Sequence, residues 1–118
     1  MKSKKMLEKI YEIVKEKNCT IRLNWFYDPD YEVSDWNSYL NFPIEGYFEP
    51  QHIGPIKVNQ WKWLEINPIE IKIIGKLIQN KEVDHSIEII RMLKENNISF
   101  SQNRKYLRVE NTWFVAET

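Results

Sequence analysis

The chain has 118 residues, of which 42% are hydrophobic and 29% charged, and its 17 basic and 17 acidic side chains give a formal net charge of zero. This length predicts a single domain over residues 1–118, and the neutral charge argues against general affinity for nucleic acid or membrane. The single Cys19 excludes an internal disulfide, and the charged N-terminus lacks the unbroken apolar run of a signal peptide. We therefore expect a cytoplasmic protein with no spanning helix.

The first predicted element is an amphipathic helix over residues 4–17. Its apolar residues recur at helical spacing, and Ser3 stands at the expected N-cap. Asn18 should end this helix, because Asn tolerates the left-handed conformation of a helix C-terminus. Residues 19–27 then alternate between apolar and polar side chains, which predicts a half-buried strand that begins at Cys19, a small buried hydrophobe.

The middle of the chain reads as short strands. They are expected over residues 44–49, 56–58 and 60–66. Trp61 and Trp63 lie two residues apart, which places them on one face of the last strand and favours packing of both in the core. Pro68 should close that strand. Residues 69–81 fit either an alternating strand or a short helix broken by Gly75.

A second helix is predicted from Asp84, as N-cap, to about Asn96. The side chains expected to point inward are Ile87, Ile90 and Leu93, and those expected to face solvent are Glu88, Arg91 and Glu95. Short strands should follow over residues 98–100, 105–109 and 112–115. The whole chain predicts an α+β fold, with a mainly antiparallel sheet of about five to six short strands packed by two amphipathic helices.

Residues 23–56 differ in charge from the rest of the chain. They hold six carboxylates, no Lys or Arg, and nine of the sixteen aromatic residues. Residues 1–22 carry a net charge of +4, and residues 57–118 a net charge of +2. Asp28-Pro29-Asp30 interrupts the preceding strand, and the stretch that continues to Phe42 shows no clear period, which predicts a long surface loop.

This acidic, aromatic stretch has two interpretations. A charge run is often only a solvated surface, but acidic residues with aromatic anchors are typical of a surface that captures a basic protein, and we favour the second interpretation. The residues expected to contact the partner are Asp28, Asp30, Tyr31, Glu32, Asp35, Trp36, Tyr39, Glu45 and Glu49.

Few residues suggest catalysis or cofactor binding. His52 and His85 could serve a small RNase-type enzyme, but nothing in the sequence brings them together, and His85 is expected to be an exposed imidazole beside a helix N-cap. The stretch that starts at Asp28 begins like a calcium loop but has Val33 and Tyr39 where a glycine and a glutamate are needed. With only three glycines and no metal-ligand motif, we expect no cofactor, no metal and no enzymatic activity.

Four short motifs stand out from Trp61 onward: Trp63-Leu64-Glu65-Ile66-Asn67-Pro68, Gly75-Lys76-Leu77, Asp84-His85-Ser86 and Ile98-Ser99-Phe100. In these motifs the chain resembles a family of small uncharacterised bacterial proteins. In size, lack of catalytic groups and segregated charge, the whole chain is also similar to the immunity proteins of contact-dependent growth inhibition and related polymorphic toxin systems. That resemblance implies a bacterial protein that binds and neutralises a cognate toxin.

The expected partner is therefore a protein toxin, in particular a nuclease with a basic active-site cleft, contacted by the acidic stretch. Two alternatives remain open. One is the RNase-type enzyme that uses His52 and His85. The other is an RNA-binding adaptor that uses Arg104, Lys105 and Arg108, although a net charge of only +2 from residue 57 onward makes nucleic acid a less favoured partner.

Overall fold

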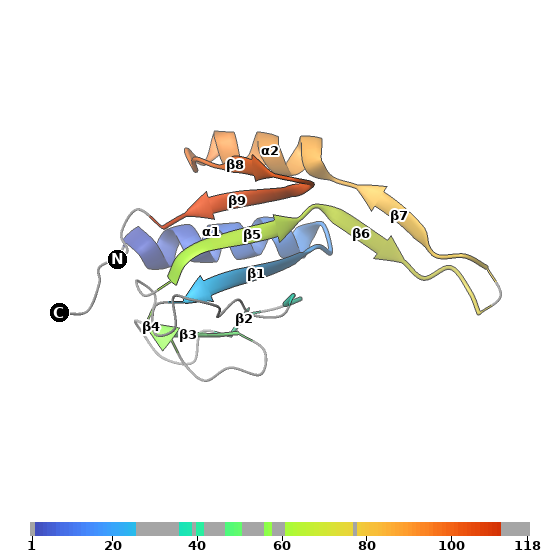
Figure 1. Ribbon diagram of the computed structural model, residues 1–118, viewed down its shortest axis with the longest axis horizontal. Helices are drawn as coiled ribbons and strands as arrows, with labels where there is room; N and C mark the ends of the chain where they lie inside the picture. The colour runs from blue at the N-terminus through green and yellow to red at the C-terminus, as the bar shows by residue number, and fades with distance from the viewer. Residues whose placement is uncertain are drawn as a thin grey trace.

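The chain has an α+β fold with mainly antiparallel strands, as the sequence predicts (Figure 1). The computed structural model describes residues 2–25, 36–38, 40–41, 47–50, 56–57, 61–76 and 78–111. The elements in chain order are α1 (Lys2–Glu16), β1 (Thr20–Trp25), β2 (Leu40–Asn41), β3 (Tyr47–Pro50), β4 (Ile56–Lys57), β5 (Trp61–Asn67), β6 (Ile69–Lys72), β7 (Lys81–Asp84), α2 (Ser86–Glu95), β8 (Ser101–Asn103) and β9 (Tyr106–Glu110).

The strands form three separate antiparallel sheets within the described residues. The largest has four strands in the order β1-β5-β9-β8, a second has the order β2-β3-β4, and the third is the hairpin of β6 and β7. The hairpin projects from one end of the four-stranded sheet as an arm (Figure 1). The described residues contain nine strands, more than the five to six expected from sequence. The two-residue strand β2 carries no periodic signal of its own, and β6 and β7 involve residues 69–81, whose pattern was ambiguous.

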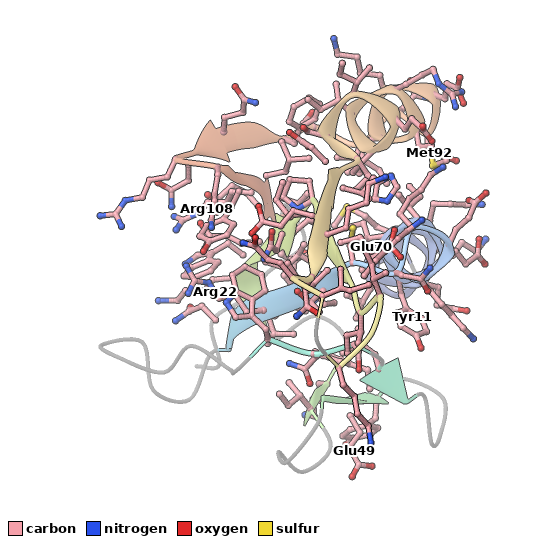
Figure 2. All side chains as sticks on the ribbon, turned by 90° about the vertical axis from the view of Figure 1, so that its right-hand side faces the viewer. Tyr11, Arg22, Glu49, Glu70, Met92 and Arg108 are labelled. Atoms are coloured by element: carbon pink, nitrogen blue, oxygen red, sulfur yellow. The ribbon has the colours of Figure 1, made fainter. Side chains whose placement is uncertain are left out.

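Both helices cover one face of the four-stranded sheet. The labelled Tyr11 of α1 and Met92 of α2 lie on the opposite side of the sheet from Arg22 and Arg108 (Figure 2). The core between the helices and the sheet is formed by alternate strand residues and by the inner stripes of both helices. Its fully buried members include Leu7, Ile10, Ile21, Leu23, Leu64, Ile66, Ile89, Leu93 and Leu107. This one-sided burial leaves the other face of the sheet for polar and aromatic side chains.

Both helices end in the same way. Asn18 and Asn97 adopt positive φ values of 54° and 56°. The N–H of the following residue donates to the carbonyl five positions back, from Cys19 to Val14 at 3.0 Å and from Ile98 to Leu93 at 2.9 Å. This is the Schellman arrangement, so the predicted termination of α1 at Asn18 is confirmed.

The two helix starts differ from the prediction. Ser3 lies inside α1, which already includes Lys2, so its assignment as N-cap is wrong: no helix-breaking residue stops the helix at that point. Asp84 is the last residue of β7, and the N-cap of α2 is His85, which makes no side-chain capping bond. The Asp84 carboxylate nevertheless accepts a 2.8 Å hydrogen bond from the backbone N–H of Ser86, the first residue of α2. Asp84 therefore provides an acceptor for one of the backbone N–H groups that have no partner within the helix, although it stands one residue before the N-cap.

The apolar stripe of α2 is also shifted from the prediction. Ile89 and Leu93 are fully buried, whereas Ile87 is 85% exposed. Two residues correspond to about 200° of rotation on a helix, so burial of Ile89 turns Ile87 to the opposite side. The predicted exposure of Glu88, Arg91 and Glu95 is confirmed.

A bulge in β5 separates the two tryptophans that were expected to share a face. Trp61 pairs with Trp25 and Trp63 with Asn24, so Lys62 is an extra residue opposite β1. Trp61 is fully buried, as expected, but Trp63 is half-buried on the outer face, and its assignment to the core is wrong. Pro68 ends β5 as predicted.

The structure also decides three further assignments. Residues 37 and 40–41, placed in the long loop, form a bridge to Ile21 and strand β2. Residues 69–72 form β6, which favours the alternating interpretation of that segment. Residues 98–100 are not a strand, because Ile98 completes the C-terminal turn of α2 before β8 begins. The strand predicted over residues 112–115 lies outside the described residues.

Candidate functional site

The outer face of the four-stranded sheet carries a layer of charged and aromatic side chains. Ile21 and Leu23 of β1 point to the core, so the intervening Arg22 points outward; Glu65 of β5 and Arg108 of β9 do the same. Arg22 and Arg108 project from this face in Figure 2. Strand alternation therefore places three ionisable groups side by side on adjacent strands.

Glu65 is the centre of this layer. It lies directly opposite Arg22 on one side and Arg108 on the other. Nε and Nη2 of Arg22 donate to Glu65 Oε1 at 2.9 and 2.7 Å, and the same atoms of Arg108 donate to Oε2 at 3.2 and 3.1 Å. Nδ2 of Asn103 also donates to Oε2, at 2.6 Å. One carboxylate thus links β1, β5, β9 and β8 across the sheet.

Aromatic rings cover the two guanidinium groups. Arg22 lies 4.6 Å from the ring centroid of Trp36 and 5.2 Å from that of Tyr106, and these two rings are 4.9 Å apart. Arg108 lies 4.1 Å from the ring centroid of Trp63. Stacking against rings and pairing with a carboxylate fix the orientation of each guanidinium. We call Arg22, Trp36, Trp63, Glu65, Asn103, Tyr106 and Arg108 the arginine–aromatic layer.

The charge state of this layer follows from its contacts. The Glu65 side chain is 0% exposed, whereas those of Arg22 and Arg108 are 30% and 28% exposed. Burial alone would raise the pKa of Glu65, but the hydrogen bonds from Asn103, Arg22 and Arg108 outweigh it and hold the pKa below its ordinary value. Glu65 is therefore ionised at neutral pH and suited to positioning the arginines rather than to transferring protons.

The arginine–aromatic layer was not predicted as a unit from sequence. Arg108 was considered only for RNA binding, and Glu65 only as part of a family motif. A usable signal was present, since Glu65 is a charge flanked by the apolar Leu64 and Ile66, and a charge that folding buries requires partners on the neighbouring strands. The identity of those partners depends on strand register, which the sequence does not reveal.

Of the residues predicted to contact a partner, two are described. Trp36 is half-buried against Arg22 and Tyr106, and Glu49 is half-buried in β3, well apart from the arginine–aromatic layer (Figure 2). The structure therefore does not bring Trp36 and Glu49 together. The others, Asp28, Asp30, Tyr31, Glu32, Asp35, Tyr39 and Glu45, lie outside the described residues.

The residues on both sides of the acidic segment, residues 26–35, belong to β1 or pair with it. The segment follows Trp25, the last residue of β1. Just after it, Asn37 exchanges two backbone hydrogen bonds with Ile21, at 3.0 and 2.6 Å, and Trp36 stacks on Arg22. The chain thus leaves β1 after Trp25 and pairs with β1 again at the buried Asn37. Four carboxylates lie between these two attachment points.

His85 is not the exposed imidazole that was expected. Its Nε2 lies 2.8 Å from Oε1 of Glu70, and its side chain is only 16% exposed. This hydrogen bond is the main cause that lowers the pKa of Glu70. His52, the other member of the proposed catalytic pair, lies outside the described residues.

Cys19 is buried, as expected of a small hydrophobe. Burial, followed by the nearby carboxylates of Glu70 and Asp84, raises the pKa of its thiol to about 11. In the part of the chain that the structure describes, no group of three or more His, Cys, Asp or Glu side chains could hold a metal ion. None of the described helices is both long and apolar enough to cross a membrane.

Comparison with known sequences places the chain in a family. The profile described as "Family of unknown function (DUF6678)" matches residues 7–111, and the chain belongs to that family. No curated protein and no solved structure matches it. The match includes every member of the arginine–aromatic layer and the whole acidic segment.

Proposed function

We propose that this DUF6678 protein is a binding protein that captures a basic protein partner through its acidic segment. The partner that fits this chemistry is a cognate bacterial toxin, in particular a nuclease with a basic active-site cleft, which the protein would neutralise as an immunity protein. The observation that carries the proposal is the charge of residues 26–35, which hold four carboxylates and no basic side chain between Trp25, the last residue of β1, and Asn37, which hydrogen-bonds to Ile21 of β1.

Capture would rest on charge and on limited chain entropy. The carboxylates would attract the Lys and Arg side chains with which a nuclease binds its substrate, and thereby speed encounter and block access to the cleft. Fixed ends reduce the conformational freedom that the segment must lose on binding. Inhibition would be steric and electrostatic, with no chemical step.

The first test is a search for the partner. The chain would be co-expressed with toxin-like proteins encoded next to its gene, and growth and co-purification would be measured. A one-to-one complex together with restored growth would support the proposal. A toxin-like neighbour that remains lethal and does not co-purify would contradict it.

The second test measures the role of the acidic segment. With the captured partner in hand, we expect the combined change Asp28→Asn, Asp30→Asn, Glu32→Gln and Asp35→Asn to lower the association rate at low salt by roughly tenfold or more, and to weaken its salt dependence. The matched control neutralises four exposed carboxylates elsewhere, Glu12, Glu16, Glu82 and Glu110. Both variants change the net charge equally, so equal association rates would show that the acidic segment has no specific role.

A second candidate function is binding of single-stranded RNA. It is favoured by the aromatic rings and partly exposed guanidiniums on the outer face, next to Arg104 and Lys105 in the turn between β8 and β9. Glu65 neutralises part of this charge, which is why we place this function second. Salt-dependent binding of an RNA oligonucleotide that is lost in Arg104→Ala/Lys105→Ala would favour it. No binding at physiological salt would exclude it.

A further inference from the structure

The arm formed by β6 and β7 carries an unusual amount of exposed apolar surface. Within the described residues, five large hydrophobic side chains are exposed, and four of them lie in this arm: Ile71 (52%), Ile73 (82%), Ile74 (53%) and Ile78 (59%). Single exposed isoleucines are ordinary, but a cluster on one projecting element marks an interaction surface. The arginine–aromatic layer and the acidic segment do not account for it.

The arm also has an open sheet edge. In the part of the chain that the structure describes, β6 pairs with β7 on one side only, and the two strands form a sheet of their own. A two-stranded hairpin is marginally stable in water, and an unpaired edge is a template for a further strand. At the base of the arm, the backbone N–H of His85 donates to the carbonyl oxygen of Pro68 at 2.9 Å and joins the two ends of the hairpin. A contact with the rest of the chain is also seen there, where Nδ2 of Asn18 donates to Oε2 of Glu70 at 3.3 Å.

The sequence of β6 is complementary to itself. If two copies of the strand pair antiparallel about Ile71, Ile69 faces Ile73 of the second copy, and Glu70 faces Lys72 of the second copy. The two-fold axis repeats each of these pairs. One face of the pair then gathers isoleucines, and the other face gathers two pairs of opposite charge. A register centred on Lys72 would instead place two lysines opposite each other.

Net charge does not oppose such an encounter. Residues 69–84 carry three lysines and three carboxylates, and the whole chain is neutral, with an isoelectric point near 6.7. Two arms can therefore approach without long-range repulsion, and a protein of near-zero net charge resists association least.

We propose that β6 pairs with β6 of a second copy of this chain, antiparallel about Ile71, to form a symmetric dimer with a continuous four-strand sheet in the order β7-β6-β6-β7. The proposal is independent of the partner captured by the acidic segment. It assigns the exposed Ile71 and Ile73 to a contact between copies, and it uses no residue of the arginine–aromatic layer.

The first experiment measures mass against concentration by analytical ultracentrifugation. The full chain should move from its 14.4 kDa monomer toward twice that mass as its concentration rises. Lys72→Glu alone and Glu70→Lys alone each place like charges opposite each other in the dimer, and each should weaken association by tenfold or more. An equimolar mixture of the two variants should associate again, because both cross-strand pairs then become Lys opposite Glu.

The second experiment does not depend on the salt-bridge variants, since Glu70 also contacts His85 and Asn18. Ile71→Cys places two thiols across the two-fold axis and should form an intermolecular disulfide under mild oxidation. Ile87→Cys is the matched control, an exposed isoleucine on α2. A monomeric mass at all concentrations, or equal cross-linking at positions 71 and 87, would overturn the proposal. If Lys72→Glu and Glu70→Lys leave the association unchanged, the copies associate through a contact other than the β6–β6 pair, and the proposal is overturned as well.

Discussion

At the scale of single residues, Glu65 is a determinant of stability. It lies between two arginines, and its own side chain is 0% exposed. Breaking a buried ion pair by removing one partner leaves uncompensated charge, which costs far more than loss of a surface pair. The arginine–aromatic layer is therefore a structural clamp whatever else the outer face binds.

We predict that Glu65→Gln lowers the free energy of unfolding at pH 7 by about 3 kcal/mol. The pKa of Glu65 in the folded chain lies below its ordinary value of 4.5, so the ionised group stabilises the fold above that pH. This contribution disappears as the pH falls through the folded-state pKa. Urea unfolding at pH 7, 5 and 3 should therefore show the difference between the two proteins shrinking toward acid.

The control for this prediction is Glu110→Gln on the same outer face, where an exposed side chain should change stability by only about 0.5 kcal/mol. A difference between wild type and Glu65→Gln that stays constant down to pH 3 would show that size or packing, rather than charge, explains the effect.

Cys19 gives a second prediction for a single residue. Because the pKa of its buried thiol is raised to about 11, only on the order of one thiol in a thousand is ionised at pH 8 in the folded chain. We expect labelling by iodoacetamide to be at least a hundredfold slower in the native chain than in urea. Rapid native labelling would show that the strand start at Cys19 opens without global unfolding.

Among elements, the helix C-termini depend on residues that tolerate positive φ. Asn97 has a φ of 56°, which allows the backbone N–H of Ile98 to donate a hydrogen bond to the carbonyl of Leu93 in α2. We predict that Asn97→Ala destabilises the chain by about 1 kcal/mol, because a Cβ without a polar group disfavours this conformation. Asn97→Gly should be close to neutral or slightly stabilising. Thermal unfolding of the pair provides the measurement, and equal effects of Ala and Gly would contradict the conformational explanation.

The elements also show how far local pattern predicts structure. Both helices, the end of α1 at Asn18 and the end of β5 at Pro68 could be predicted, because each depends on residues within one or two turns. The opposite facing of Trp61 and Trp63 could not, since it depends on a bulge that arises only when β5 pairs with β1. The exposure of Ile87 likewise reflects which side of α2 meets the sheet.

The same limit applies to the candidate site. The charge bias of residues 23–56 can be read directly from composition, but the Arg22–Glu65–Arg108 row joins residues 43 positions apart on each side. Only strand order and register create that row. Trp36 was expected as an anchor for a partner, and the structure shows its ring engaged by Arg22 and Tyr106. Its predicted role at an interface remains to be measured.

For the whole molecule, the four-stranded sheet with its helices and the projecting arm should behave as separable parts. Lys72 and Lys81 face each other in the register of β6 and β7, so residues 73–80 can be replaced by Asn-Gly, the preferred two-residue hairpin turn. The contacts of Pro68, Glu70 and His85 at the base of the arm are all kept, because these residues lie outside the replaced segment. We predict that this shortened chain keeps its free energy of unfolding to within about 1 kcal/mol, because it loses mainly exposed surface.

The shortened chain should nevertheless remain a monomer at concentrations where the full chain associates, because it lacks Ile73, which faces Ile69 of the second copy in the proposed dimer, and also lacks the exposed Ile74 and Ile78. Urea unfolding and sedimentation, measured on the same preparation, separate the two effects. A large loss of stability would mean that the arm tip packs against the rest of the chain, and its exposed isoleucines would then need no second copy. Retained stability together with lost association would instead assign the apolar surface of the arm to the contact between copies.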